Sequence, residues 1–519
     1  EVVINGAYKG LYVLQEKIKA DDNRVNIVRI SSFDINPPEL TGGYITKADK
    51  TTGGDPIAWT MYSWTGATVS YIHELPKPEN VTPEQNTYIR YQFDRLEVTA
   101  NNNDISISNG FPSIIDIPSF IDYMIINELS SNADAYTYSA FFHKDRSGKL
   151  RAGPLWDMDL TYGNDLFFWG YDRSHPDVWQ FSTGDNDGSR FWKDLFGNPT
   201  FRCYLSKRWN ELIQPGMPLN PSAITTFIDQ TVSITGEAVI RDYALWGTTG
   251  SYQQQINNIK FFINTRIAWI TSNIGPYSEC ASVPVPPLVI TKINYNPAAS
   301  VEFPQSEDLE FIEITNNGDQ TIDMTGIYFG GTGFVYQFPV SSVLHPGSSA
   351  YIASNTGAFR AKYGLSPFGR YTRKLSDKSE DLVLVDAFGN VIDNVTYSDT
   401  IPWPDADGNG RYLVLADPSL DNSLPENWIA SNEIIVSDPN LPAYSPIVLY
   451  PNPVDDILNI QSESEIVSAG LFDISGRLLL TIQVGDDNCV LNLGSLPKGI
   501  YMIRITTLSG TLTEKIIKD

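Results

Sequence analysis

The chain has 519 residues, 42% of them hydrophobic and 12% aromatic, so it is long enough for two to four folded domains. It carries 36 basic and 61 acidic residues, and the net charge of −25 argues against a nucleic-acid partner. No apolar run approaches the length of a transmembrane helix. Three cysteines and four histidines are too few and too scattered for a disulfide framework or a His-based metal centre. Cys203 and Cys280 either pair or stay separate thiols.

The first region, residues 1–279, mixes helical and strand-like segments. It begins at Glu1, without Met, inside a segment that looks like a strand. We therefore expect a fragment or processed form that lacks a leader and the first elements of its domain. Residues 280–287 are rich in Pro and Val and predict a stiff linker.

Within this region, a helix is followed by two loops that each carry an aspartate. Residues 116–132 have a capping residue and apolar residues at helical spacing, which predicts a helix. Asp134 follows on a loop. Residues 135–144 and 149–155 predict a hairpin, and Asp157 comes directly after it. We expect the hairpin to bring the two aspartates side by side.

Two carboxylates in this order suit phosphoryl transfer. One accepts the proton of an acceptor hydroxyl, and the other holds Mg²⁺ on the nucleotide phosphates. Asp134 is the candidate catalytic residue, and Asp157 is the candidate Mg²⁺ ligand, with Asp159 and Asn164 as further candidates. Taken alone, such aspartates are more often caps or turn residues. Trp156 either stacks on an adenine or packs beneath the metal loop.

A long polar, Gly-rich segment follows at residues 171–190. It predicts either a substrate-facing loop or a disordered insertion. Residues 189–213 have apolar residues at helical spacing and predict two packed helices.

The pattern becomes all-β between residues 288 and 431, with short alternating runs and a hairpin at residues 381–397. The segment DADGNGR at residues 405–411 places oxygen-bearing side chains at alternate positions. Asp405 and Asp407 therefore either form a solvated turn or hold Ca²⁺.

The last part of the chain predicts a small β-sandwich. Residues 432–446 form a second linker, and residues 447–519 contain six or seven short strands, two of them joined by a Ser-Gly turn. We thus expect a multidomain chain in which one α+β domain is followed by two β-sandwiches.

Four segments of the first region share a pattern with known proteins: INGAYKGLYVLQEKI (4–18), GGYITKADK (42–50), NADAYTYSAFFHKD (132–145) and AGPLWDMDLTYGN (152–164). Together they resemble the CotH kinase family. The resemblance implies an atypical protein-kinase fold, truncated at its N-terminus, that uses ATP and Mg²⁺ with Asp134 as catalytic aspartate and Asp157 as metal ligand. Glu16 and Lys47 are candidates for the pair that positions the nucleotide phosphates, and Lys50 is as suitable as Lys47 by spacing.

Two features depart from this pattern. Kinases place an Asn five residues after the catalytic Asp to bind metal, whereas position 139 is Ser, a poorer ligand. The chain also has no Gly-rich phosphate loop of the usual form.

The other two regions carry resemblances of their own. Segments at 293–297, 309–329, 338–354 and 375–404 resemble the lamin-tail domain, an immunoglobulin-like sandwich. YPNPVDD, FDISGRLL and LPKGIYMIRI in the last region resemble the type A C-terminal sorting domain of type IX secretion. That resemblance implies the type IX secretion machinery as a partner and a secreted or outer-surface location.

Two functions remain open at this point. The first is a secreted kinase that transfers phosphate from ATP to Ser or Thr of surface or matrix proteins whose identity is unknown. The alternative is a surface protein with a degenerate kinase fold that binds without catalysis. Ser139 and a compartment poor in ATP favour the alternative.

Overall fold

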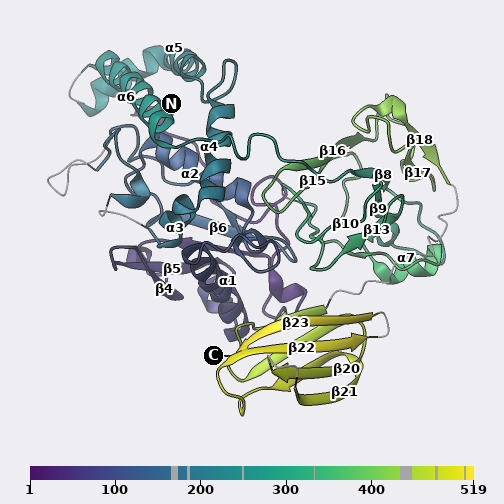
Figure 1. Cartoon of the computed structure of the whole chain (residues 1–519). Coiled ribbons are helices and arrows are strands. Elements are labelled where there is room, and N and C mark those ends of the chain that lie inside the picture. The colour runs from purple at the N-terminus through teal and green to yellow at the C-terminus, as the bar shows by residue number, and fades with distance from the viewer. Residues whose placement is uncertain are drawn as a thin grey trace.

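The computed structural model describes residues 1–164, 173–183, 188–247, 251–331, 333–432, 447–473, 477–507 and 510–518. The linker expected at 432–446 and the Ser-Gly turn at 475–476 therefore lie almost wholly outside the described residues. Figure 1 shows three domains: the first domain, with elements between residues 2 and 273, the middle domain (288–431, green) and the C-terminal domain (447–518, yellow).

The first domain is built on an antiparallel sheet covered by helices. Its five described strands have the order β4 (Trp59–Tyr62), β5 (Thr68–Leu75), β3 (Tyr44–Ala48), β6 (Ala140–Lys144) and β7 (Arg151–Ala152). The helices are α1 (Pro83–Asn101), α2 (Ile117–Ser130), α3 (Phe191–Gly197), α4 (Pro199–Leu212), α5 (Pro221–Trp246) and α6 (Tyr252–Asn273). Between sheet and helices lies an aromatic core that includes Tyr71, Phe93, Phe142 and Trp192.

Helix α2 confirms the helix predicted at 116–132. The Asp116 carboxylate accepts a hydrogen bond from the Ser119 backbone N–H at 2.9 Å, which satisfies one of the free donors of the first turn. The helix ends where Ser131 adopts the left-handed region, with φ of +48°. The expected hairpin is also confirmed, because β6 and β7 pair in antiparallel register. Helices α3 and α4 confirm the two helices expected at 189–213.

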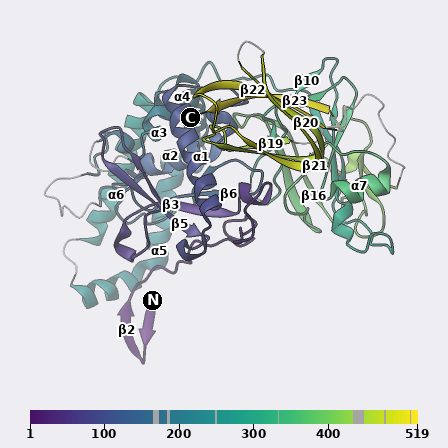
Figure 2. The ribbon, with the colours of Figure 1, turned by 90° about the horizontal axis from the view of Figure 1, so that it is seen from below.

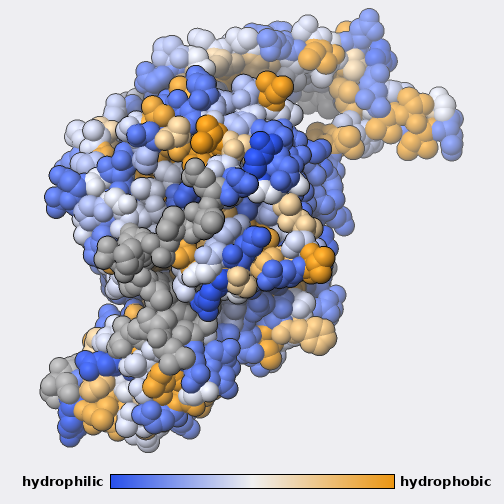
Figure 3. Space-filling model, turned by 90° about the vertical axis from the view of Figure 1, so that its right-hand side faces the viewer, coloured by the Kyte–Doolittle hydropathy of each residue, from blue (hydrophilic) through white to orange (hydrophobic). Residues whose placement is uncertain are grey.

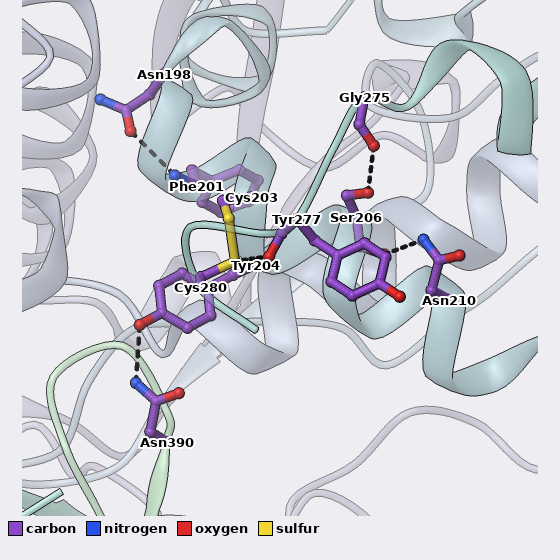
Figure 4. The surroundings of a disulfide bond; sticks show 10 residues. All are labelled: Asn198, Phe201, Cys203, Tyr204, Ser206, Asn210, Gly275, Tyr277, Cys280 and Asn390. Carbon is purple, nitrogen blue, oxygen red and sulfur yellow. Dashed lines mark hydrogen bonds between the residues drawn. A yellow bond between two sulfur atoms is a disulfide. The ribbon is translucent and has the colours of Figure 1, made fainter. Parts of the chain in front are cut away.

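A disulfide joins Cys203 on α4 to Cys280, with 6.0 Å between the Cα atoms (Figure 4). It settles the open alternative in favour of pairing. Around it, Ser206 donates to the Gly275 carbonyl at 2.6 Å, and Arg202 donates to the carbonyls of Asn273 and Ile274. The segment after α6 is therefore fixed to α4 by one covalent bond and several hydrogen bonds.

The N-terminal segment is a hairpin and not the single strand expected from its sequence. Strands β1 (Val2–Ile4) and β2 (Ala7–Gly10) are joined at Asn5-Gly6, both with positive φ, as a tight hairpin turn requires. Figure 2 shows the hairpin projecting from the rest of the molecule. Leu11 N–H donates to Asp242 of α5 at 2.7 Å and holds its base.

The middle domain is a sandwich of two sheets with one helix, α7 (Thr356–Tyr363). The larger sheet has the order β14 (Gly369–Arg370), β13 (Ser349–Ala353), β9 (Phe311–Asn316), β8 (Leu288–Asn294), β17 (Tyr412–Leu415) and β18 (Trp428–Ser431). The smaller contains β11 (Tyr328–Phe329), β15 (Ser379–Val385) and β16 (Val391–Ser398). Strands β10 (Ile322–Asp323) and β12 (Val343–Leu344) form a separate pair. The hairpin expected at 381–397 is confirmed by β15 and β16.

The C-terminal domain is one curled sheet of β19 (Ile447–Tyr450), β20 (Ile457–Asp473), β21 (Leu478–Asn492), β22 (Gly499–Thr507) and β23 (Gly510–Lys518). The described residues thus hold five strands, where we expected six or seven. The reason is that β20 pairs with β19 through its first half and with β22 through its second half. A bridge between Val454 and Lys518 nearly closes the sheet around its core.

The first and middle domains share a polar, buried interface. The Tyr328 hydroxyl donates to Asp116 at 3.1 Å, and the Lys149 ammonium lies 3.9 Å from the Tyr328 ring centroid and donates to the Ala387 carbonyl. Thr372 donates to the Arg146 carbonyl at 3.0 Å. These contacts hold the two domains in a defined orientation.

The surface is largely hydrophilic on the face in Figure 3, with apolar side chains concentrated on one projecting part. Helices α5 and α6 carry several exposed apolar side chains, yet within the described part of the chain no helix is apolar over a membrane-spanning length.

Candidate active site

The register of β3 against β6 builds the first part of the candidate site. Ala48, the last residue of β3, pairs with Ala140, the first residue of β6. The next residue of each strand, Asp49 and Ser139, therefore also meet, and the Ser139 backbone N–H donates to Asp49 Oδ1 at 3.3 Å. The end of β3 and the start of β6 thus supply adjacent polar side chains.

Asp157 joins this group from the segment after β7. The Ser139 hydroxyl donates to Asp157 Oδ2 at 3.3 Å. Both residues adopt the left-handed region, with φ of +52° for Ser139 and +60° for Asp157, which is uncommon for residues with a Cβ. Backbone strain of this kind gathers at functional sites. Asp157 is exposed, so its carboxylate is open to a ligand.

Hydrogen bonds also hold the Asp134 loop beside the Asp157 segment. The Ala133 N–H donates to the Leu160 carbonyl at 3.1 Å, and the Tyr162 N–H donates to the Ser130 carbonyl at 2.7 Å. Asn132 accepts from the Asp134 N–H and donates to Met158 Sδ at 3.4 Å. The two loops are therefore neighbours, as the helix-hairpin order led us to expect.

The Asp134 carboxylate faces two cations. Lys50 Nζ lies 3.2 Å from its Oδ2, and Arg173 Nη1 lies 3.3 Å from its Oδ1. The Lys50 side chain is 49% exposed and also lies over the Tyr138 ring, with 4.5 Å from Nζ to the centroid. The Arg173 side chain is only 8% exposed. Lys50 is thus the solvent-exposed partner of Asp134, and Arg173 is the buried one.

The expected pair of Glu16 and Lys47 does not form. Glu16 lies on an exposed loop and pairs with Lys19 and Arg24. Among the described residues, Lys47 forms two ion pairs. Its ammonium lies 3.1 Å from Asp49 and 3.6 Å from Glu74 of β5. Lys47 pairs with Glu74 instead because Glu74 lies on the strand that pairs with β3, whereas Glu16 precedes the sheet on an irregular segment.

The remaining predicted residues lie near the site with fewer contacts. Trp156 is half-buried, packs on a small apolar cluster and meets Phe141 edge-on at 6.5 Å, which favours packing over adenine stacking. Asp159 and Asn164 are exposed, and the Asn164 amide donates to the Asp159 carbonyl at 2.7 Å. Their predicted role as metal ligands is untested by these contacts.

The oxygen atoms around Asp157 fit a magnesium ion bound together with phosphates. Mg²⁺ takes one or two carboxylates and fills its remaining positions with water and phosphate oxygens. Asp157 supplies a carboxylate and Ser139 a hydroxyl, and the two are linked by a hydrogen bond. The Asp49 carboxylate beside them is taken by nitrogen donors, with the Ser139 and Lys50 N–H groups on Oδ1 and Lys47 on Oδ2. Within the described ranges no cluster of three or more His, Cys, Asp or Glu forms a protein-only metal site.

The acidic turn at 405–411 is closed by its own side chains. Arg411 contacts Asp405 Oδ2 at 2.8 Å, and Asn409 donates to Asp405 Oδ1 at 3.0 Å. Asn296 donates to Asp407 at 2.6 Å. Nitrogen donors thus take the oxygens that Ca²⁺ would need, and these contacts favour the turn over the calcium site.

Three residues of the site escaped the analysis of the sequence. Asp49 stands between Lys47 and Lys50, so its place in the TKADK segment was a usable signal. Glu74 could be found only from the pairing of β3 with β5. Arg173 falls in the segment 171–190, for which we left a substrate-facing loop open; residues 171–172 and 184–187 of that segment lie outside the described residues.

Comparison with sequence families identifies the first domain. The model of the CotH kinase protein family matches residues 1–270, which is more than half of the chain. The chain belongs to the CotH kinase family. The use of ATP with a divalent metal is general in this family, and the fold of the first domain is the kinase-like fold expected from the sequence.

Two further family models match the remaining domains. The lamin-tail domain matches residues 282–399, and the secretion system C-terminal sorting domain matches residues 448–519. The chain is therefore a secreted, kinase-like protein with an immunoglobulin-like lamin-tail domain. Its sorting domain directs it through type IX secretion to the cell surface or outside.

Other comparisons add little. No curated protein matches the chain. Among solved structures, latent PorU from Porphyromonas gingivalis shares 14% identity over 44% of this chain and 19% of that chain, with a TM-score of 0.16. PorZ, a surface component of type IX secretion in Porphyromonas gingivalis, shares 12% identity over 41% of this chain and 35% of that chain, with a TM-score of 0.13. The BSP domain of a biofilm-associated protein shares 12% identity over 45% and 52%, with a TM-score of 0.13. The chain spans less than two thirds of each, and such scores carry no argument.

Proposed function

We propose that the first domain binds Mg²⁺ and ATP and transfers the γ-phosphoryl group to Ser or Thr hydroxyls of surface or matrix proteins. One observation supports this most: the Asp134 loop and Asp157 lie side by side, with Lys50 on the first carboxylate and the Ser139 hydroxyl on the second. Phosphoryl transfer needs little else from a protein than positioned carboxylates and cations.

Each residue has a distinct task in this proposal. Asp157, with the Ser139 hydroxyl beside it, would hold the Mg²⁺ ion, which neutralises charge on the phosphates when bound. Lys47, oriented by Glu74, and Lys50 would contact phosphate oxygens. Asp134 would accept the proton of the acceptor hydroxyl.

Lys50 has two possible partners in the proposed site. Its ammonium contacts Asp134 in this structure, and half of its side chain is exposed. A nucleotide phosphate carries more negative charge than one carboxylate, so Lys50 would turn to the phosphate when the nucleotide binds. That movement leaves Arg173 to orient Asp134 and gives the acceptor hydroxyl access to Oδ2.

The test is phosphate transfer from γ-labelled ATP to the protein itself and to a Ser/Thr peptide library. The wild-type chain should incorporate label only with Mg²⁺, and Asp134→Asn should lose incorporation while it keeps nucleotide affinity, because the substitution removes the proton acceptor alone. Asp319→Ala, which changes an exposed carboxylate of the middle domain, is the matched control and should behave as wild type. Equal labelling of wild type and Asp134→Asn contradicts the assigned role of Asp134.

The second candidate is a surface protein that binds without catalysis. It is favoured by one observation, the ion pairing of both Asp134 oxygens, which occupies the group that should accept a proton. Under this alternative, Mg²⁺ and ATP bind without any label transfer, or do not bind at all.

A further inference from the structure

A cavity of about 430 Å³ lies where the three domains meet, away from the candidate active site. The first domain contributes the segment around Pro38 and one side of α1, the middle domain contributes the segment 370–373, and the C-terminal domain contributes Val448 and Gln461. In Figure 1 the C-terminal sheet lies beneath both other domains, close to α1. The volume falls in the range of small-molecule sites.

The charge of the cavity wall is opposite to that of the protein. One acidic side chain, Glu39, lines the cavity. Five basic side chains line it as well: Arg95, Lys144, Arg146, Arg370 and Arg373. The whole chain has 36 basic against 61 acidic residues, so this ratio is a local reversal. In an acidic protein, a concentration of cations around a cavity creates a local attraction for anions.

Three of these cations have no carboxylate within ion-pair distance in the described parts of the chain. Arg95 donates to the Ser113 hydroxyl at 3.3 Å, Arg370 donates to the Ser354 carbonyl at 3.0 Å, and Lys144 donates to the Thr41 carbonyl. Neutral oxygens satisfy some of their donors and leave their charges uncompensated. A guanidinium group has five N–H donors, so Arg95 and Arg370 keep donors for a ligand.

The other two arginines are already partly neutralised. Arg146 contacts Asp34 at 2.9 Å, but its Nε is buried and makes no hydrogen bond to any residue that the structure describes. Arg373 contacts Asp22 at 2.6 Å. They stabilise the wall, and Arg146 adds one donor that has no partner within the described parts of the chain.

Lys144 is a buried cation in this wall. Its side chain is only 4% exposed, and burial lowers its pKa to about 7, although Asp145 opposes the shift. A bound anion would supply the charge that keeps this ammonium protonated.

We propose that this cavity binds a phosphate-bearing ligand, held by Arg95, Arg370 and Arg146. Guanidinium groups pair with phosphate oxygens in bidentate geometry, and a phosphate supplies the negative charge that Arg95, Arg370 and Lys144 lack among the described residues. Tyr88, Tyr336 and Tyr371 give the cavity aromatic walls for the organic part of such a ligand. The proposal does not rest on phosphoryl transfer, because the cavity shares no residue with the candidate active site.

The test is calorimetric titration of the full chain with pyrophosphate and with glucose 6-phosphate, in EDTA so that no Mg²⁺-dependent site contributes. Wild type should bind, and Arg95→Gln and Arg370→Gln should each weaken binding about tenfold, because each removes a charge-assisted hydrogen bond. Arg90→Gln is the matched control: Arg90 lies on the same helix, α1, is 55% exposed and does not line the cavity. The probe that binds more tightly shows whether the cavity prefers an inorganic phosphate or a sugar phosphate.

Several results would overturn the proposal. Wild type failing to bind either probe at millimolar concentration, Arg90→Gln weakening binding as much as Arg95→Gln, or malonate binding as tightly as pyrophosphate would each do so. Unfolding temperatures of the unliganded variants establish that they are folded. Asp157→Ala should bind both probes as wild type does, which separates this test from that of the proposed kinase function.

Discussion

The first and middle domains each carry an acidic, glycine-containing turn, and the two turns differ in where their partners come from. Asp405 of the middle domain is satisfied by Asn409 and Arg411, four and six residues further along the same turn. Asp157 of the first domain meets Ser139, eighteen residues away, across a hairpin. One turn closes on itself, whereas the other presents its carboxylate to neighbouring elements.

This difference shows that acidic residues in a turn do not by themselves indicate a cation site. A turn that holds a nitrogen donor for each carboxylate oxygen is complete without a metal ion. Among the described residues, Asp157 has a hydroxyl and no nitrogen donor as its side-chain partner, and it adopts a strained backbone conformation. Ligand binding provides an explanation for this geometry.

The largest expected effect separates the first domain from the middle domain by activity. Asp134→Asn should lower the rate of phosphate incorporation by about a thousandfold, the scale of a lost proton acceptor. Asp405→Asn should leave the rate unchanged, because that turn belongs to another domain. Initial rates with labelled ATP measure both, and a comparable loss in Asp405→Asn would break the comparison.

The domains should also differ in their response to reduction. The disulfide closes a segment of 77 residues in the first domain, and the middle domain contains no cysteine. Cys203→Ser should destabilise the first domain by about 4 kcal/mol, because the cross-link restricts its unfolded chain. Urea unfolding measures the change in free energy, and calorimetry shows which domain's thermal transition has shifted. A loss of stability in the middle domain instead of the first would contradict this prediction.

A buried carboxylate of the middle domain sharpens the contrast with the exposed Asp157. Glu310 is fully buried, and burial raises its pKa to about 8, although Tyr371 and the Leu375 N–H donate to it. The pKa of Glu310 in the folded domain lies above the unfolded value of 4.5. Its contribution to the free energy of unfolding is therefore complete below pH 4.5 and is lost as the pH rises towards 8.

Between pH 5 and pH 8 the middle domain should therefore lose on the order of 3 kcal/mol relative to Glu310→Gln, which does not titrate. Urea unfolding of both proteins at the two pH values measures this. A wild-type domain that gains stability over that range, relative to the variant, contradicts the raised pKa.

The smallest expected effect concerns calcium. Because nitrogen donors occupy the oxygens of Asp405, Asp405→Ala should cost less than 1 kcal/mol, the scale of an exposed ion pair. Adding Ca²⁺ or a chelator should not change the unfolding temperature of the middle domain. A clear calcium-dependent stabilisation that Asp405→Ala abolishes would restore the calcium site.

Regular patterns allowed much of the fold to be predicted from the sequence. The capped helix α2, the β6–β7 hairpin and the β15–β16 hairpin all followed from local spacing and turn residues. The hairpin at Asn5-Gly6 was missed although its turn signal was present in the sequence. The long, bent β20 was divided into shorter strands because alternation alone does not show where a strand changes partner.

The candidate site was predictable only in part. The order of elements predicted that the Asp134 loop and the Asp157 segment are neighbours, because both flank one local hairpin. The partner of Lys47 could not be found in the same way, since Glu74 meets it through strand pairing across the sheet. The cationic cavity could not be predicted from the sequence either, because its arginines come from two domains and meet only in the folded chain.

The most direct test of the central claim is the affinity of the full chain for ATP, measured by calorimetry with Mg²⁺ and with EDTA, in wild type and Asp157→Ala. We predict that wild type binds ATP more tightly with Mg²⁺ and that Asp157→Ala loses this dependence. Equal Mg²⁺ dependence in the two proteins would contradict the assignment of Asp157 as the metal ligand.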